Sequence, residues 1–531
     1  MTNNQYTYNQ PPQGPMMPPP QGAPRPRGWR ERWMQRFGMS GQMPRAKELT
    51  IPNWITGKTI AFFFVAMFLC WFVFGYVPGF DLWIVAAISV VLFFYGGSAM
   101  AKSWIRIKEK AFLKNVFTVG FVVRLAFVGY MFFSFNPNRY GATYGDGADV
   151  VWYMPFGEAI AQWIRDGFNI PFGELKESWQ ASIDDIGYPI WLGIVYFLTG
   201  SESDVLIPFI LKSLMGAYCA ILIYRVSKRH FGEGTARIAA IFIALNPNMI
   251  YWCGNMMKEA EMVFLVCLAV ELLDNAMTSN KRMTIRHMLP ALLVGFYLFF
   301  FRAALGMVVF LAVFAHIVMA SNRVMGWGKK IIAGVLVALT LFVGAGDSLR
   351  SRVDNVVEAA QSATSGGQEA DANWRANRVD EGGHKQSFAK YAGAAVFAPL
   401  IFTIPFPTFN EANVAQVVQV QLSGGAYIKN IFSFFVILVL IMLLLSGEWR
   451  RHVFIIAYTM GYLMCLVLST FAQSGRFHMP VWPMLMLFAA YGIQLAKTNP
   501  KIRKWFPIVL ILEVFICLGW NWFKLKGRGM I

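Results

Sequence analysis

The chain has 531 residues, of which 56% are apolar and only 14% are charged, and its formal net charge is +18. Soluble domains have about a quarter charged residues, so this composition excludes an ordinary water-soluble protein. The basic residues gather in the loops between apolar stretches, which favours membrane lipids as partners and argues against nucleic acid.

Residues 1–58 precede the first apolar stretch and form the predicted cytoplasmic N-terminus. Residues 1–28 contain eight of the 25 prolines among Gln, Gly and Asn, a composition that cannot bury a core and predicts disorder. The segment RGWRERWMQRF then mixes arginine with tryptophan, as do segments that lie on an anionic membrane surface.

Thirteen apolar stretches follow, most of them close to the length that crosses about 30 Å of hydrocarbon. We therefore expect an all-α polytopic membrane protein with about 13 transmembrane helices. Residues 59–114 contain the first two predicted spans, and residues 497–531 contain the last span and a basic tail. The stretches lie near 59–77, 82–100, 115–134, 205–224, 236–252, 260–273, 288–301, 303–320, 331–345, 428–446, 452–471, 479–496 and 505–520.

Two further apolar runs, GYPIWLGIVYFLTG and AAVFAPLIFTIPF, are short and contain proline. If both lie on the outer face, more than half of the 47 lysines and arginines fall in loops on one side, which the positive-inside rule identifies as the cytoplasm. The long loops 135–204 and 346–427 are then external. The basic tail FKLKGRGMI is a misfit, because this scheme places it outside.

The first external loop contains the sequence GDGADVVWYMPFGEAI, in which Asp146 and Asp149 precede a helix-like segment. Carboxylates at the membrane surface can accept a proton from an acceptor hydroxyl or hold a divalent cation. The same residues also suit an ordinary turn around Asp146 and a helix cap at Asp149. Both interpretations remain open from these residues alone.

Charged residues within spans or at their outer ends are costly and usually functional. Apart from Arg124, those found here fall near the outer face in the charge scheme, at the level of the two aspartates. Snorkelling or ion pairs between helices would explain them without a ligand. Several cations beside carboxylates and lipid also suit a phosphate on a long hydrocarbon tail. The residues are Arg124, Lys258, Glu259, Arg302 and Arg476, with His478 close behind.

Nucleotide-binding and hydrolase motifs are missing from the sequence. It has no GxxxxGK[ST] loop and no GxGxxG after a strand, and neither HExxH nor GxSxG occurs. A nucleotide sugar as donor, zinc proteolysis and serine hydrolysis are therefore disfavoured.

The order of several segments resembles the membrane-embedded GT-C glycosyltransferases, above all the branch of bacterial protein O-mannosyltransferases and lipid A aminoarabinose transferases. The resemblance implies a catalytic membrane module over residues 115–496, with the GYP run as a juxtamembrane helix on the outer face. Residues 59–100 are then two additional spans. The segments are GDGADVVWYMPFGEAI, GYPIWLGIVYFLTG, LIYRVSKRHFGEGTARIAAIFIALNPNMIYW with the KEAEM that follows, and GRFHMPVWPMLMLFAAYGI.

The resemblance also implies a catalytic residue. In that family an aspartate in the first external loop, four residues ahead of a tyrosine, is the catalytic carboxylate. Asp149 and Tyr153 match this spacing, and Asp146 is the second choice. Val150 stands where the family often has a second acidic residue, so no metal ligands are assigned and a divalent cation is only a candidate cofactor.

The expected function is transfer of a sugar from a polyprenyl phosphate to an unknown lipid, glycan or protein acceptor. The reaction would occur on the external face of a bacterial inner membrane. Asp149 would take the acceptor proton, and Lys258, Arg302 and Arg476 would stabilise the departing lipid phosphate. Tyr153, Glu259 and His478 complete the predicted substrate-binding set.

Two alternatives remain. An O-antigen-type polymerase or ligase would use arginine and histidine residues of the loop 346–427. A non-enzymatic lipid or sugar transporter predicts internal repeats and broken helices at the bilayer midplane, and no repeat is visible. The loop offers the first alternative Arg350, Arg352, Arg375, Arg378 and His384.

Overall fold

The computed structural model describes part of the chain, and every regular element in this part is a helix. No strand occurs in it, so the expected all-α fold is confirmed for these residues. Asp146 lies outside the described part, as do the expected span 331–345 apart from its first residue and the residues 346–399 and 410–417 of the second long loop. The described residues are 50–75, 80–134, 148–167, 185–200, 205–278, 285–319, 328, 331, 400–409, 418–468 and 474–527.

Seven helical segments in the described residues are long and apolar enough to cross a membrane. Each coincides with a span predicted from the sequence. They are α2 (Asn53–Phe74), the segment Trp83–Ser103 formed by α3 (Phe80–Val91), η1 (Leu92–Gly96) and α4 (Gly97–Ser103), α5 (Glu109–Ser134), α10 (Leu206–Phe231), α20 (Val418–Ser446), the segment Gly475–Lys497 formed by α22 (Gly475–His478), η8 (Met479–Val481) and α23 (Trp482–Thr498), and α24 (Pro500–Gly527).

Five other expected spans form helices that are shorter or more polar. The stretch 236–252 is interrupted at Asn246, whose side chain accepts a hydrogen bond from the Met249 amide and starts a new helix with Pro247 in its first turn. This is the usual chemistry of a helix N-terminus. The helices are α11 (Glu233–Leu245) with α12 (Pro247–Tyr251) and η3 (Trp252–Gly254), α13 (Glu259–Thr278), α14 (Ile285–Tyr297) with η4 (Leu298–Phe300), α15 (Ala303–Met319) and α21 (Val453–Leu468).

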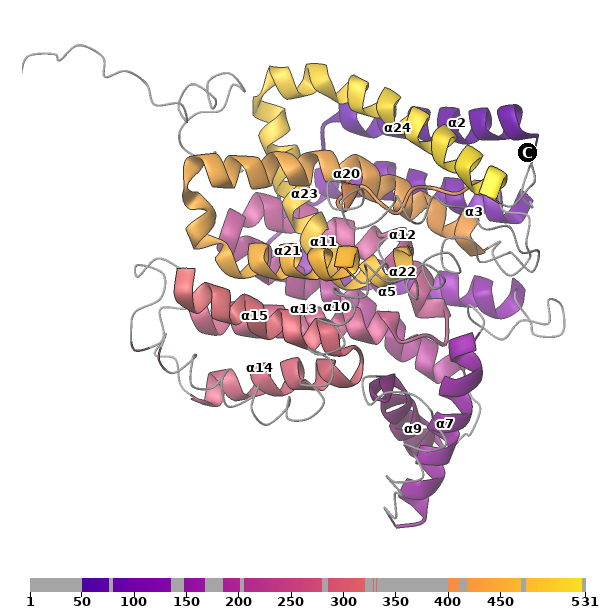
Figure 1. The fold of residues 1–531 in the computed structure, drawn as a ribbon, viewed down its shortest axis with the longest axis vertical. Coiled ribbons are helices and arrows are strands. Elements are labelled where there is room, and N and C mark those ends of the chain that lie inside the picture. The colour runs from indigo at the N-terminus through magenta and orange to yellow at the C-terminus, as the bar shows by residue number, and fades with distance from the viewer. Residues whose placement is uncertain are drawn as a thin grey trace, which may run out of the picture.

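Figure 1 shows the long helices lying side by side, with α7 (Ala148–Arg165) and α9 (Gly187–Thr199) projecting from the bundle as a pair. In the bundle, α10 packs against α5, α11 and α13, while α20 packs against α3 and α23. Residues 234–245 of α11 are all buried, so this short helix forms the centre of the fold. Helix α2 packs against α24 at the edge.

Helices α7 and α9 pack closely at Gly193, which has no side chain. A Cβ atom added to Gly193 would lie 2.5 Å from Cγ2 of Ile160 and 2.9 Å from the carbonyl oxygen of Gly157. No larger residue fits there without moving one helix. The GYP run forms α9, and its 13 residues are too few to cross the hydrocarbon core.

Arg124 lies within the apolar helix α5 and is fully buried. Its Nη1 donates to the carbonyl oxygens of Gly120 at 2.9 Å and Ala244 at 2.8 Å, and its Nη2 donates to that of Ile243 at 3.0 Å. The last carbonyls of a helix lack partners within the helix, so Arg124 satisfies the end of α11 from a neighbouring helix. This intramembrane charge therefore has a structural role.

We expect Arg124→Met to lower the melting temperature of the purified protein strongly. The substitution leaves buried carbonyl groups at the end of α11 without a donor, at a cost of about 1–3 kcal/mol each. Thermal unfolding in detergent measures the effect, and Arg106→Met, at an exposed position, is the control. Equal melting temperatures of the two variants would contradict the structural role assigned to Arg124.

Candidate functional site

The charged residues expected at the outer ends of spans come together in the structure. Lys258 and Glu259 stand at the start of α13, Arg302 lies between η4 and α15, and Arg476 and His478 belong to α22. These elements are far apart in the chain, yet Glu259 bonds Arg476, and Lys258 is close enough to Arg302 for their charges to interact. The structure therefore brings these charged residues together, whereas Asp146 and the side chain of Asp149 lie outside the described residues.

Glu259 is fully buried in the first turn of α13, where the helix dipole favours a carboxylate. One of its oxygens, Oε1, accepts a hydrogen bond from Nε of Arg476. The other, Oε2, is buried and has no hydrogen-bond partner in the described part of the chain. An acidic side chain thus holds Arg476 in place and keeps one oxygen available inside the site.

Lys258 pairs with a residue that the sequence did not single out. Its Nζ bonds Oδ1 of Asp185, two residues before the start of α9, and the Tyr153 hydroxyl donates to the same carboxylate at 3.1 and 3.2 Å. Burial lowers the pKa of Lys258 from its usual value, and the negative charge of Asp185 opposes this effect. The three side chains join α7, α9 and α13.

Arg302 has a different environment from the two cations beside it. It is half-buried, its Nη1 donates to the Tyr462 hydroxyl at 3.0 Å, and its guanidinium lies 4.3 Å from the centre of the Phe477 ring. The Tyr462 hydroxyl in turn donates to the Phe477 carbonyl at 2.9 Å. Lys258 and Arg476 each have a carboxylate partner, whereas no carboxylate pairs with Arg302 among the described residues.

A buried ion pair supports the turn that presents Lys258. Lys212 of α10 donates to the carbonyls of Asn255 at 2.6 Å and Met257 at 2.5 Å, and its Nζ lies 3.5 Å from Glu261. Both side chains are buried. Lys212 stands inside an apolar stretch, so the rule that drew attention to Arg124 would also have found Lys212.

His478 is fully buried, and its Nδ1 lies 3.0 Å from Nζ of Lys429 in α20. Lys429 also donates to the Ile404 carbonyl, and Asn430 donates to the Pro405 carbonyl at 3.3 Å. Helix α20 thereby holds both the segment 400–409 and α22. In the structure His478 supports the helix that carries Arg476.

Asp149 lies in the first turn of α7, one turn ahead of Tyr153, but its side chain lies outside the described part. Asp185 is the carboxylate whose contact with Tyr153 is described. The adjacent acids of the sequence SIDDIGYPIW, directly before a short apolar run, were the signal that could have identified it. The five residues of the polymerase or ligase alternative also lie outside the described residues.

Within the described ranges, no three His, Cys, Asp or Glu side chains group as a metal site. No protein-family model matches the chain, and no curated protein matches it. The resemblance to GT-C enzymes therefore rests on the order of the sequence segments.

We expect the Lys258–Asp185 pair to couple strongly in a double-mutant cycle of thermal stability with Lys258→Met and Asp185→Asn. Loss of one partner leaves the other charge uncompensated, and groups in direct contact couple by about 0.5–3 kcal/mol.

The exposed pair Lys228–Glu109, 2.6 Å apart, is the control, because exposed ion pairs couple by only about 0.2–1 kcal/mol. Additive effects of the two substitutions at Lys258 and Asp185 would show that this contact does not hold α9 to α13.

Proposed function

We propose that the chain is a GT-C-type membrane glycosyltransferase that moves a sugar from a polyprenyl phosphate to an acceptor on the external face of a bacterial inner membrane. The observation that carries the proposal is the half-buried guanidinium of Arg302. It stands beside the ion pairs of Lys258 and Arg476 and lacks a carboxylate partner among the described residues. The planar guanidinium favours, in such a place, an anionic ligand that offers two acceptor oxygens, as a phosphate does.

The proposed topology has thirteen crossings with a cytoplasmic N-terminus, and the pairing of the basic loops supports it. Arg237 donates to the carbonyls of Trp104 and Ile107 at 3.0 Å, and Lys228 bonds Glu109. The loops that the positive-inside rule assigns to the cytoplasm thus contact one another at one end of α10. Lys212, near the other end of α10, adjoins the candidate site.

The balance of charge supports a phosphodiester donor. Two cations in the site are compensated by Asp185 and Glu259, which leaves the positive charge of Arg302 for a single negative charge. A polyprenyl phosphate sugar carries one such charge. When the bond from the anomeric carbon to the phosphate oxygen breaks, the lipid phosphate gains a second charge, and the fixed cations stabilise this change.

The proposed reaction is a direct displacement. The acceptor hydroxyl oxygen attacks the anomeric carbon as the phosphate leaves, so the sugar inverts, and Asp149 takes the hydroxyl proton. Asp146 is the second candidate for the base. Tyr153, Asp185 and Lys258 would hold α7 against α13, which places the first turn of α7 near the cations. A divalent cation would share the stabilisation of the phosphate.

We expect Asp149→Asn to lower turnover about a hundredfold to ten-thousandfold while donor affinity stays near normal, because asparagine cannot accept the proton. The assay uses purified protein with a polyprenyl-phosphate sugar. Asp166→Asn, at the exposed end of the same helix, is the matched control.

If Asp149 only stabilises the start of α7, asparagine should replace it well, since both residues suit a helix N-terminus. Normal turnover by Asp149→Asn with loss in Asp146→Asn would move the base to Asp146. Normal turnover by both variants would remove this loop from the mechanism.

A further inference from the structure

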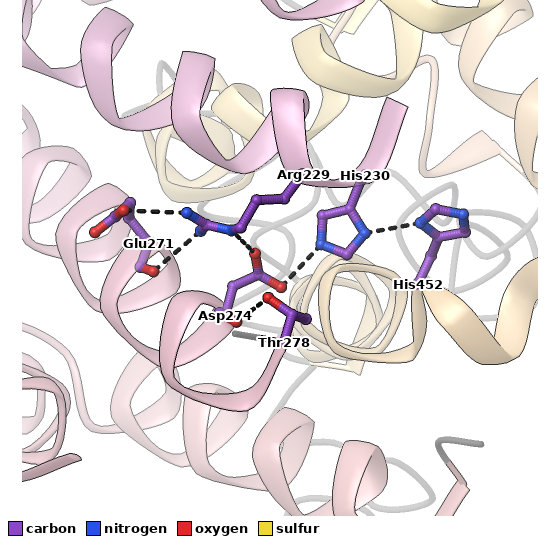
Figure 2. A network of polar contacts seen from close by, with 6 residues as sticks. All are labelled: Arg229, His230, Glu271, Asp274, Thr278 and His452. Atoms are coloured by element: carbon purple, nitrogen blue, oxygen red, sulfur yellow. Dashed lines mark hydrogen bonds and ion pairs between the residues drawn. The ribbon is translucent and has the colours of Figure 1, made fainter. Parts of the chain in front are cut away.

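A second polar network lies at the other end of α10 and α13 from the candidate site. Figure 2 shows Arg229 and His230 from the end of α10, Glu271 and Asp274 from the last turns of α13, and His452, the residue before α21. Asp274 is fifteen residues beyond Glu259, which is about 22 Å along a helix. The proposed reaction makes no use of this network.

The contacts of the network join three helices. Nε of Arg229 donates to Oδ2 of Asp274 at 2.6 Å, and its two other nitrogens donate to the side chain and carbonyl of Glu271 at 3.2 and 3.1 Å. Nε2 of His230 lies 2.8 Å from Oδ1 of Asp274. Nδ1 of His230 lies 2.8 Å from Nδ1 of His452. Figure 2 shows these contacts as one continuous chain.

The geometry restricts where the protons can be. Asp274 accepts from Arg229 and is ionised, so Nε2 of His230 must carry a hydrogen to bond the same carboxylate. The two Nδ1 atoms face each other at hydrogen-bond distance, so one of them carries a hydrogen and the other offers a lone pair. The hydrogen bond between the two Nδ1 atoms can therefore form in a neutral pair or in a pair with one extra proton. It cannot form when both rings are protonated.

The charges of the network favour the singly charged pair. With His230 protonated, the two positive charges of Arg229 and His230 balance the two negative charges of Glu271 and Asp274. His452 is then the neutral acceptor. Burial lowers the pKa of His452, and the nearby charges of His230 and Arg451 lower it further, against the opposing effect of Asp274.

The other surroundings of His452 are mostly aromatic. Phe231 stacks on its ring with 4.8 Å between centres, and Tyr491 of α23 stacks on Phe231 at 4.3 Å. The charge of Glu448 in η6 (Glu448–Arg451) acts on Tyr491. One further histidine is near, because His316 of α15 lies against Phe454, two residues beyond His452.

We propose that His230 and His452 share one proton as a clamp, which fastens the ends of α10 and α13 to the start of α21 and opens when the pair takes up a second proton. Two Nδ1–H groups would then face each other, and the positive charges of the two buried imidazolium rings would repel each other. The hydrogen bond between the helices is lost. In the proposed topology this end of the bundle faces the cytoplasm, so the clamp responds to acidification there.

The same helices lead to the candidate site. Helix α21 carries Tyr462, which bonds Arg302, and α13 begins with Glu259, which bonds Arg476. Opening of the clamp would free the start of α21, while Arg229 still holds the end of α13 to α10. An effect of acid on the outer site rests on the proposed function, whereas the clamp itself does not.

The test is hydrogen exchange of the full-length protein in detergent at pH 7.5 and pH 5.5, corrected for the intrinsic effect of pH. A histidine with a lowered pKa in the folded state stabilises above its ordinary value of about 6.5, and this stability is lost as the pH falls below it. Opening of residues 453–460 should rise by up to tenfold per pH unit below about 6.5, for one proton. Residues 222–231 and 268–278 should change less, because Arg229 and His230 still bond Asp274 after the clamp opens.

The matched variants are His452→Asn and His316→Asn. Asparagine at 452 keeps an acceptor near the place of Nδ1 but cannot take a proton, so the rise in exchange at pH 5.5 should be lost. The same substitution at His316 should leave the rise intact. His452→Phe, which keeps the stacking on Phe231, provides a second unprotonatable variant.

Two results would overturn the clamp. One is an unchanged acid response in both variants at position 452. The other needs no variant: exchange in the wild-type protein that rises equally at residues 259–265, the far end of α13, would show general acid loosening. Neither result depends on whether the chain transfers sugars.

Discussion

Hydrocarbon offers no partner to a charged side chain, so each buried charge in this bundle must be satisfied by a neighbouring helix. Lys212 is held by carbonyls and Glu261, Arg124 by the carbonyls that end α11, and Arg476 by Glu259. Each contact joins segments that are distant in the chain. The same pairing that makes these charges tolerable fixes how the helices pack, and two of the polar groups lie toward opposite ends of α10 and α13.

The two groups differ in what they leave unsatisfied. Among the residues of Figure 2, two cations balance two carboxylates once His230 is protonated, and the network closes on itself. In the group around Lys258, Arg302 faces a hydroxyl and an aromatic ring, and Oε2 of Glu259 is buried without a hydrogen-bond partner in the described residues. A network in which every charge has a partner suits a structural or proton-sensitive role. A group in which a cation lacks a carboxylate partner suits the binding of an anionic ligand. This difference between the two groups underlies the proposal of a phosphate-bearing donor.

Hydropathy predicted the seven long helices because a run of about twenty apolar residues has the length of a membrane-spanning helix. Hydropathy overestimated the length of the helix in the stretch 236–252, which Asn246 and Pro247 divide into two helices. The Asn-Pro pair in the sequence was a signal of this helix break. The convergence of Lys258, Glu259 and Arg476 agrees with the common level that the distribution of basic residues predicts for them. Tyr462 was missed because its importance comes from contacts across the bundle that neither periodicity nor spacing reveals. Asp185 and Lys429 were missed although the sequence carried a signal for each, adjacent acids before a short apolar run and a lysine inside a predicted span. The side chain of Asp149 is not among those described, so its assignment as the base still rests on its spacing from Tyr153.

The central claim is that Arg302 binds the phosphate of a polyprenyl-linked donor. Binding of a polyprenyl-phosphate sugar to the purified protein, measured by native mass spectrometry, tests it most directly with Arg302→Gln beside Arg450→Gln, an exposed arginine of η6. The account predicts that the wild-type protein and Arg450→Gln bind the donor, and that Arg302→Gln binds it at least tenfold more weakly, since a hydrogen bond to a charged group contributes about 1.5–3 kcal/mol. Equal binding by all three proteins, or no binding by the wild type, would contradict the claim.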